Sequence, residues 1–172
     1  MTVNTAIKAY LPQGADFYRT TPSATPPLGE GGPRFELGTE VVGENGTTWV
    51  FVKAATAHKQ FDCVTIDESF NSTSITNTTA AKGYMLGFAQ VAFTILDYGW
   101  VAIAGSGIQC RVKAVLNHSG KIYGPATSSG SAGVLRASAA GRTKIGGLVT
   151  VTTSSGSAKS PEIQANWPVL LI

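Results

Sequence analysis

IQCRVKAVL, residues 108–116, decides the fold class, because apolar and polar side chains alternate along it. The apolar set is Ile108, Cys110, Val112, Ala114 and Leu116, and the polar set between them is Gln109, Arg111 and Lys113. Successive side chains of a strand point to opposite faces, so a period of two is typical of a strand with one buried face. This stretch therefore predicts a strand.

Similar patterns recur along the chain. Val41 and Val42, a turn at residues 44–46 and the run 48–52 together predict a hairpin. Further strands are predicted at residues 61–66, 84–94, 100–104, 122–123, 134–135, 148–152 and 163–167, with a short helix as the alternative at 84–94. In the last of these, Trp167 is expected on the same buried face as Ile163 and Ala165. Residues 105–107, Gly-Ser-Gly, are expected to form a tight turn.

No window of ten or more residues shows the pattern of an amphipathic helix. Short strands joined by Gly-rich turns are typical of sandwiches and barrels. The sequence therefore predicts an all-β fold, a small β-barrel or β-sandwich.

Residues 1–36 differ from the rest and hold five of the eight prolines. Proline does not continue a helix or fill a central strand, so we expect an extended Pro/Gly-rich N-terminal arm ahead of a body at residues 37–172. The candidate docking residues in the arm are Tyr10, Leu11, Phe17, Tyr18 and Arg19. A disordered leader is the alternative. Deletion of residues 1–34 is expected to leave the body folded.

The C-terminal run WPVLLI carries no charged side chain. Chain ends are usually exposed, so an apolar end predicts either a subunit contact or a place in the core. Leu170, Leu171 and Ile172 are therefore further candidate contacts.

Charged residues make up only 13% of the chain, against about 25% in typical domains. Because charge keeps free monomers soluble, this composition favours a surface that is covered in an assembly. The 13 basic residues are dispersed and give a net charge of +3, whereas nucleic-acid footprints need clustered charge. The chain has neither an apolar run of membrane-spanning length nor a signal-like h-region. We expect no direct nucleic-acid partner, no membrane and synthesis in the cytoplasm.

Titratable residues do not form a recognisable catalytic pattern. His58, Asp62 and Cys63 lie close in sequence, but on a strand Cys63 would point away from the other two. No spacing of His and Cys suits zinc, and no Gly-rich loop has the lysine and helix of a phosphate loop. Cys63 and Cys110 sit among apolar neighbours and are interpreted as reduced core residues, with a disulfide left open. The sequence predicts no enzyme, metal or cofactor.

Several stretches together resemble the small capsid decoration (cement) proteins of tailed bacteriophages. They are ELGTEVVGENGTTWVFVKA (36–54), GFAQVAF (87–93), DYGWVAI (97–103) with Gly105, CRV (110–112), IY (122–123) and KIGGLV (144–149). The resemblance covers about residues 36–170 and leaves out the arm.

The resemblance implies a β-tulip-like body on the outer surface of the capsid in the virion. Such a protein would form a trimer with copies of itself, contact the major capsid protein and bridge neighbouring capsid subunits. It carries no catalytic residue to transfer. The alternatives are a tail, fibre or head–tail joining protein, and a carbohydrate-binding β-sandwich whose exposed aromatic side chains stack on sugars.

Overall fold

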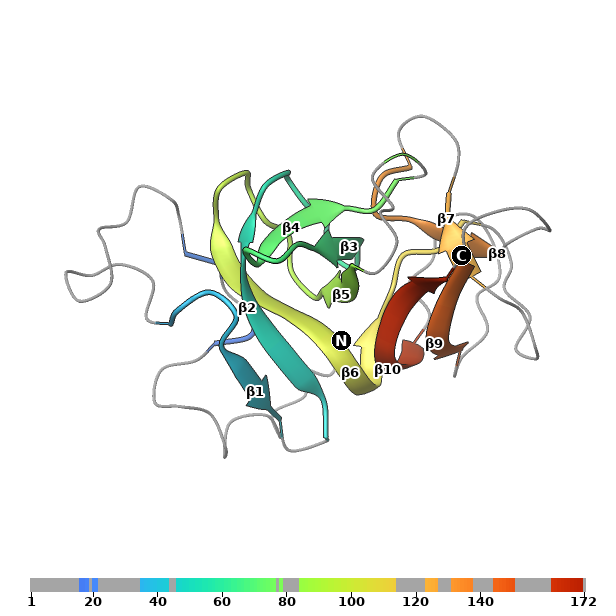
Figure 1. The fold of residues 1–172 in the computed structure, drawn as a ribbon, viewed down its shortest axis with the longest axis horizontal. Coiled ribbons are helices and arrows are strands. Elements are labelled where there is room, and N and C mark those ends of the chain that lie inside the picture. Colours follow the sequence, from blue (N-terminus) through green and yellow to red (C-terminus); the bar gives the residue numbers. More distant parts are fainter. Residues whose placement is uncertain are drawn as a thin grey trace.

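The computed structural model describes residues 16–18, 20–21, 35–43, 46–76, 78, 84–113, 123–126, 131–137, 144–150 and 162–171. Within these residues there is no helix and there are ten strands (Figure 1). They are β1 (Glu40–Val42), β2 (Thr48–Ala54), β3 (Cys63–Ile66), β4 (Asn71–Ser74), β5 (Met85–Ala89), β6 (Tyr98–Gln109), β7 (Tyr123–Pro125), β8 (Leu135–Ala137), β9 (Lys144–Thr150) and β10 (Glu162–Leu171). Among these residues no helix is long and apolar enough to span a membrane.

The strands form one large mixed sheet in the order β1-β2-β4-β3-β5-β6-β10-β9-β7-β8, with additional pairings β2–β6 and β5–β10. All described strand pairs are antiparallel except β2–β4. The predicted all-β class is confirmed. The predicted hairpin is also confirmed, because β1 and β2 pair with Val42 opposite Thr48. The barrel, sandwich and β-tulip expectations stay predictions.

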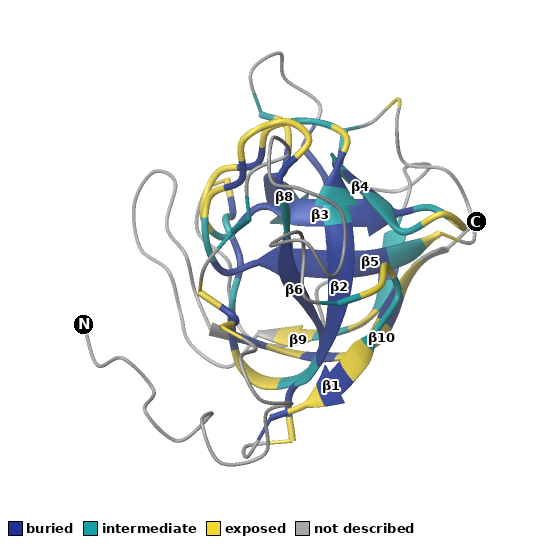
Figure 2. Ribbon diagram, turned by 90° about the vertical axis from the view of Figure 1, so that its left-hand side faces the viewer, coloured by how far each residue is buried: buried dark blue, intermediate teal, exposed yellow. Residues whose placement is uncertain are grey.

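Strand β2 is buried on both faces (Figure 2). Trp49 and Phe51 point into one apolar cluster, while Val50, Val52 and Ala54 point into a second. Strand β6 pairs with β2, with Phe51 opposite Trp100, and its side chains divide between the same two clusters. Burial on both faces explains why these strands read as continuous apolar runs rather than as alternating ones.

The tight turn predicted at residues 105–107 is wrong. Strand β6 runs through all three residues, with φ of 114° at Gly105 and 76° at Gly107. At this point β6 leaves β2, where Thr48 faces Ala104, and continues along β10 as far as Gln109. A Cβ atom at Gly105 would lie 2.5 Å from the Cα atom of Thr47. The glycines therefore let the strand bend between two partners instead of reversing the chain.

The burial pattern predicted from IQCRVKAVL is confirmed for the described residues. Ile108, Cys110 and Val112 are buried, whereas Arg111 is half-buried and Lys113 is exposed. The strand itself is shorter than predicted, because β6 ends at Gln109 and Val112 forms only an isolated bridge. Residues 114–116 lie outside the described residues.

The buried position predicted for Trp167 is wrong. Ile163 and Ala165 are buried as expected, but Trp167 is 47% exposed and has a φ of 44°. The pairing of β10 with β9 shifts between Ala165 and Val169. The extra residues of this bulge break the period of two, and Pro168 becomes the next buried residue.

Candidate functional site

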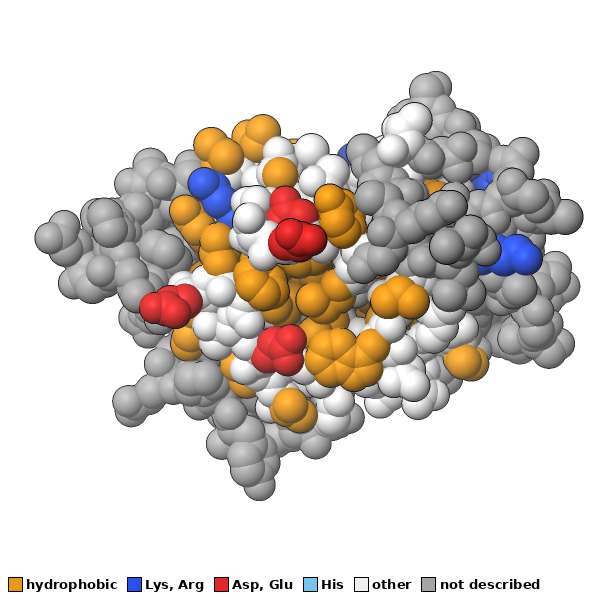
Figure 3. Space-filling model, viewed as in Figure 1, with side chains coloured by type: hydrophobic (Ala, Val, Ile, Leu, Met, Phe, Trp, Pro, Cys, Tyr) orange, Lys and Arg blue, Asp and Glu red, His pale blue; other side chains and the backbone are white. Residues whose placement is uncertain are grey.

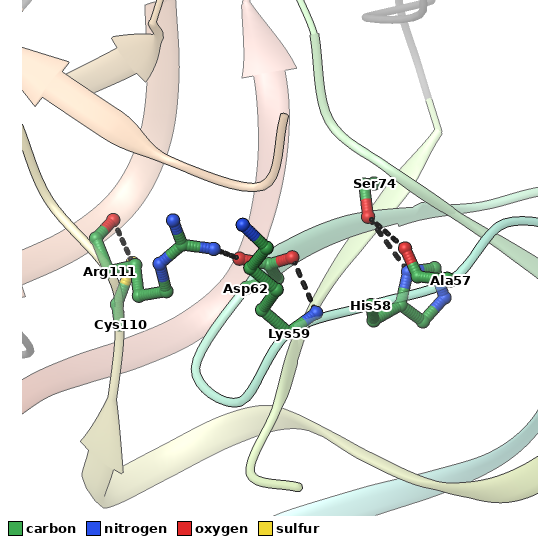
Figure 4. A network of polar contacts seen from close by, with 7 residues as sticks. All are labelled: Ala57, His58, Lys59, Asp62, Ser74, Cys110 and Arg111. Atoms are coloured by element: carbon green, nitrogen blue, oxygen red, sulfur yellow. Dashed lines mark hydrogen bonds and ion pairs between the residues drawn. The ribbon is translucent and has the colours of Figure 1, made fainter. Parts of the chain in front are cut away.

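Asp62 and Arg111 form a partly buried ion pair that joins three parts of the chain (Figure 4). The Asp62 carboxylate also accepts a hydrogen bond from the backbone N–H of Lys59 at 2.8 Å. The backbone N–H of Arg111 donates to the carbonyl of Phe61, and the carbonyl of Arg111 accepts from Leu135. The pair therefore holds the segment before β3, the end of β6 and the start of β8 together.

The environment of Asp62 is tightly packed. Its side chain is 3% exposed, and a Cβ atom at Gly133 would lie 2.1 Å from its Cγ atom. Burial raises the pKa of the Asp62 carboxyl, while the Lys59 backbone N–H and the Arg111 guanidinium oppose that rise. A charge in this setting is stabilised only by its hydrogen-bonded partners. The pair has the properties of a structural tie.

His58 is buried and both ring nitrogens are hydrogen-bonded. Nδ1 lies 2.8 Å from the Ser74 hydroxyl and Nε2 lies 2.8 Å from the Ser72 hydroxyl. The ring packs edge-on against Phe93, and the two residues pair through their backbones. His58 is thus engaged by β4, while Asp62 is engaged by Arg111. The side chains of His58 and Asp62, which the sequence suggested could lie on one face of a strand, therefore have separate partners.

Acid should selectively weaken the fold at His58. Burial lowers its pKa from 6.5 to about 4. Between these values the unfolded chain binds a proton that the folded chain does not, so stability falls as pH falls. The loss should reach about 3 kcal/mol by pH 4 and then level off. Urea unfolding of wild type and His58→Gln at pH 7 and pH 4 measures it, with His118→Gln as the control. If His58→Gln loses as much free energy of unfolding between pH 7 and pH 4 as wild type does, the assignment to His58 is wrong.

Cys63 and Cys110 are both free and fully buried, which confirms the interpretation as reduced core residues. Burial raises the pKa of both thiols well above the ordinary value. A thiol rather than a thiolate at neutral pH is a poor nucleophile and a poor metal ligand. In the part of the chain that the structure describes, no three His, Cys, Asp or Glu side chains gather as metal ligands do.

A cluster of rings on β2 and β6 accepts one residue of the predicted arm. We call Trp49 and Trp100 the aromatic socket. Phe17 lies in it and is 1% exposed, stacked on Trp49 with ring centroids 4.5 Å apart and edge-on to Trp100 at 5.4 Å. Tyr18 is 46% exposed and contacts the edge of Trp49.

The other predicted contact residues are placed only in part. Leu170 and Leu171 belong to β10, where they pair with Ile145 and Lys144 of β9. Tyr10, Leu11, Arg19 and Ile172 lie outside the described residues. Of the arm predicted at residues 1–36, the structure describes 16–18, 20–21 and 35–36, so its boundary stays a prediction.

Sequence reasoning missed a set of exposed apolar side chains around β10. We call them the apolar strip: Tyr84, Val149, Trp167 and Val169. Val169 faces Met85 of β5 on one side and Gly146 of β9 on the other, which places these residues on neighbouring strands. Figure 3 shows a face on which hydrophobic side chains gather between acidic ones. The Gly146-Gly147 pair and Pro168 were the sequence signals that could have indicated the bulge exposing Trp167.

The fold and these sites define an all-β protein with a large mixed sheet, a partly buried ion pair and apolar side chains left at its surface. No known family model matches the sequence, and no curated protein is similar enough to count as a relative.

Proposed function

We propose that this chain is a structural virion protein that binds the outer surface of a phage capsid and stabilises it by bridging neighbouring subunits. Its partners are the major capsid protein and further copies of itself, as a trimer. It works by binding and not by catalysis, and it uses no cofactor. The support is the resemblance of residues 36–170 to capsid decoration proteins, the low charge, and the apolar strip.

The observation that carries the proposal is the exposure of Trp167. Its side chain is 47% exposed, and its φ of 44° is a conformation that bulky residues rarely adopt. Tryptophan and tyrosine also dominate the energetics of protein interfaces. The apolar strip is therefore our candidate for the capsid-binding surface.

A symmetric shell multiplies a weak contact. Burial of apolar surface stabilises a contact by about 25 cal/mol per Å². Each copy therefore needs to bury only a modest apolar area. Once one copy of a trimer is bound, the other two bind at high effective concentration. A small strip on each body is then sufficient for firm attachment.

Replacing Trp167 with asparagine should reduce binding to expanded, empty capsid shells at least tenfold, since asparagine removes the indole but tolerates the positive φ. Co-sedimentation over a concentration series measures the affinity. Ile95→Ser is the matched control, because Ile95 is 54% exposed in the turn before β6. An equal loss of shell affinity in both variants would mean that the apolar strip is not the capsid-binding surface. If wild type does not bind shells, and cryo-electron microscopy of the virion shows no such density on the capsid, the decoration role is wrong.

A carbohydrate-binding role is the second candidate, favoured by two exposed aromatic side chains. Trp167 belongs to β10, and Tyr84 directly precedes β5, the strand that pairs with β10. Exposed aromatic rings on neighbouring strands can stack on sugar rings. Retention of wild type on a glycan array, lost in Trp167→Asn and kept in Ile95→Ser, would favour this role over capsid binding.

A further inference from the structure

Two loops project side by side from one end of the sheet, the loop between β2 and β3 and the loop between β5 and β6 (Figure 1, Figure 2). Backbone hydrogen bonds join them. His58 and Phe93 bond to each other in both directions, at 3.0 and 2.9 Å, and the N–H of Leu96 donates to the carbonyl of Ala54 at 2.7 Å. The two loops therefore form one connected surface.

The exposed side chains of this surface are apolar. Within residues 54–58 and 91–96, every exposed residue except Thr94 is apolar, and we call this set the apolar tip: Ala55, Ala57, Ala92, Ile95 and Leu96. Ile95 is 54% exposed and Leu96 is 45% exposed. Single exposed apolar side chains are common, whereas a gathered set marks an interaction site.

The turn that carries Ile95 and Leu96 is firmly held. The N–H of Asp97 donates to the carbonyl of Thr94 at 3.1 Å, and the Asp97 carboxylate accepts from the N–H of Thr94 at 2.9 Å. Leu96 has a φ of 71°, a conformation that glycine or asparagine usually adopts in turns. The turn thus presents two large aliphatic side chains in a fixed position while the N–H groups of Thr94, Leu96 and Asp97 are bonded within the protein.

The charge that these two segments present to solvent is positive. Residues 53–62 and 91–98 hold two lysines, Lys53 and Lys59, and two acids, Asp62 and Asp97. Both acids are buried, with Asp62 bonded to Arg111 and Asp97 to the turn. Lys59 is exposed, and Lys53 is half-buried with its ammonium 5.6 Å from the centroid of the Tyr98 ring. Cations therefore flank the apolar tip.

An aliphatic tip flanked by cations fits an anionic lipid surface. Aliphatic side chains enter the acyl region, while lysines remain at the headgroups, where anionic lipids attract them. Acyl chains form no hydrogen bonds, so a segment that enters them needs its N–H groups paired internally, as they are in this turn. A pocket in another protein is the alternative partner. Protein interfaces depend mostly on Trp, Tyr and Arg, and the apolar tip contains none of these.

We propose that the apolar tip binds an anionic phospholipid surface, with Ile95 and Leu96 inserted among the lipids and Lys53 and Lys59 at the headgroups. The expectation of no membrane partner came from the lack of a spanning run, and a surface contact needs no such run. The apolar tip and the apolar strip lie on different segments. This inference needs neither a capsid nor a trimer and stands apart from the proposed function.

Co-sedimentation of the full-length chain with vesicles tests the proposal. Wild type should bind phosphatidylcholine vesicles that contain phosphatidylglycerol at least tenfold more tightly than phosphatidylcholine alone, because each lysine near an anionic surface contributes about fivefold. Lys53→Gln/Lys59→Gln should remove this preference. Ile95→Ser/Leu96→Asn should lower the affinity for the anionic vesicles at least tenfold, and asparagine tolerates the positive φ.

Trp167→Asn is the matched control, because Trp167 is a comparably exposed apolar side chain outside the apolar tip. It should keep vesicle binding. A wild-type protein that binds no vesicle, or an equal loss in Trp167→Asn, would overturn the proposal. Loss of shell binding instead of vesicle binding in Ile95→Ser/Leu96→Asn would also overturn it, since the tip would then contact a protein. Wild type that binds vesicles but not shells would count against the proposed function alone.

An environment-sensitive dye reports insertion directly. It can be attached to Ile95→Cys, because the native Cys63 and Cys110 are fully buried. Its emission should shift to the blue when anionic vesicles are added. The same dye on Val42→Cys should not shift, since Val42 is 57% exposed but lies on β1, away from the two loops. An unshifted dye at position 95 would contradict insertion of the apolar tip.

Discussion

Replacing Arg111 with methionine should lower the free energy of unfolding by about 3–5 kcal/mol, because it leaves a buried carboxylate without its counter-ion. The Asp62 side chain is 3% exposed, and the other described hydrogen bond to its carboxylate comes from the backbone N–H of Lys59. Gly133 closes the space around the carboxyl group. Removal of the guanidinium therefore leaves the carboxylate closely packed with one described hydrogen bond. Urea unfolding at pH 7 measures the change.

The pH dependence of this variant separates an electrostatic cause from lost packing. Without Arg111, burial should raise the pKa of Asp62 further, so the carboxyl can take up a proton in the folded state. The loss of unfolding free energy in Arg111→Met should therefore become smaller as the pH falls through this raised folded-state pKa. Lys59→Met is the control, since it removes an exposed cation near the same carboxylate and should cost less than about 1 kcal/mol. A deficit in Arg111→Met that is independent of pH would contradict the ion-pair explanation.

Sequence periodicity predicted the strands whose environment is uniform along their length. The hairpin of β1 and β2 follows from two β-branched runs around a turn, and the burial of Ile108, Cys110 and Val112 follows from strict alternation. In both cases one local pattern reflects one local environment. Strand β4, at Asn71–Ser74, has no apolar residue that could indicate a strand, and its serines are polar. They are buried by a tertiary contact, the hydrogen bonds to His58.

The errors lie where one strand changes its partner or its register. Gly105 and Gly107 have the local pattern of a turn, but β6 bends there and continues because it pairs with β10, which is more than fifty residues away in sequence. The alternating pattern predicts Trp167 as a core residue, because the sequence alone does not show the bulge opposite Gly147. Both errors concern glycines whose positive φ serves a long-range pairing, and a single sequence does not show which pairing that is.

The aromatic socket could be predicted only in half. An aromatic residue in a proline-rich segment indicates an anchor, so Phe17 was correctly singled out as a candidate contact residue. Its position against Trp49 and Trp100 of its own body depends on the β2–β6 pairing. The same ring that was expected to contact a partner therefore contributes to the core of the fold, and this changes what its removal should do.

Replacing Phe17 with alanine should lower the free energy of unfolding by about 3–5 kcal/mol, the usual cost of emptying a buried phenylalanine site. Phe17 is 1% exposed and stacks within 4° of parallel on Trp49. Deletion of residues 1–34 removes the same ring and the backbone bridge between Thr21 and Tyr98, so we now expect it to destabilise the body by at least as much. That reverses the expectation from sequence that the body would be unaffected.

Tyr18→Ala is the matched control for this prediction, since Tyr18 is the next residue but is half-exposed and contacts only the edge of Trp49 among the described rings. It should cost less than about 1.5 kcal/mol. Guanidinium unfolding of both variants and wild type measures the difference. A Phe17→Ala variant as stable as Tyr18→Ala would mean that the ring does not support the core.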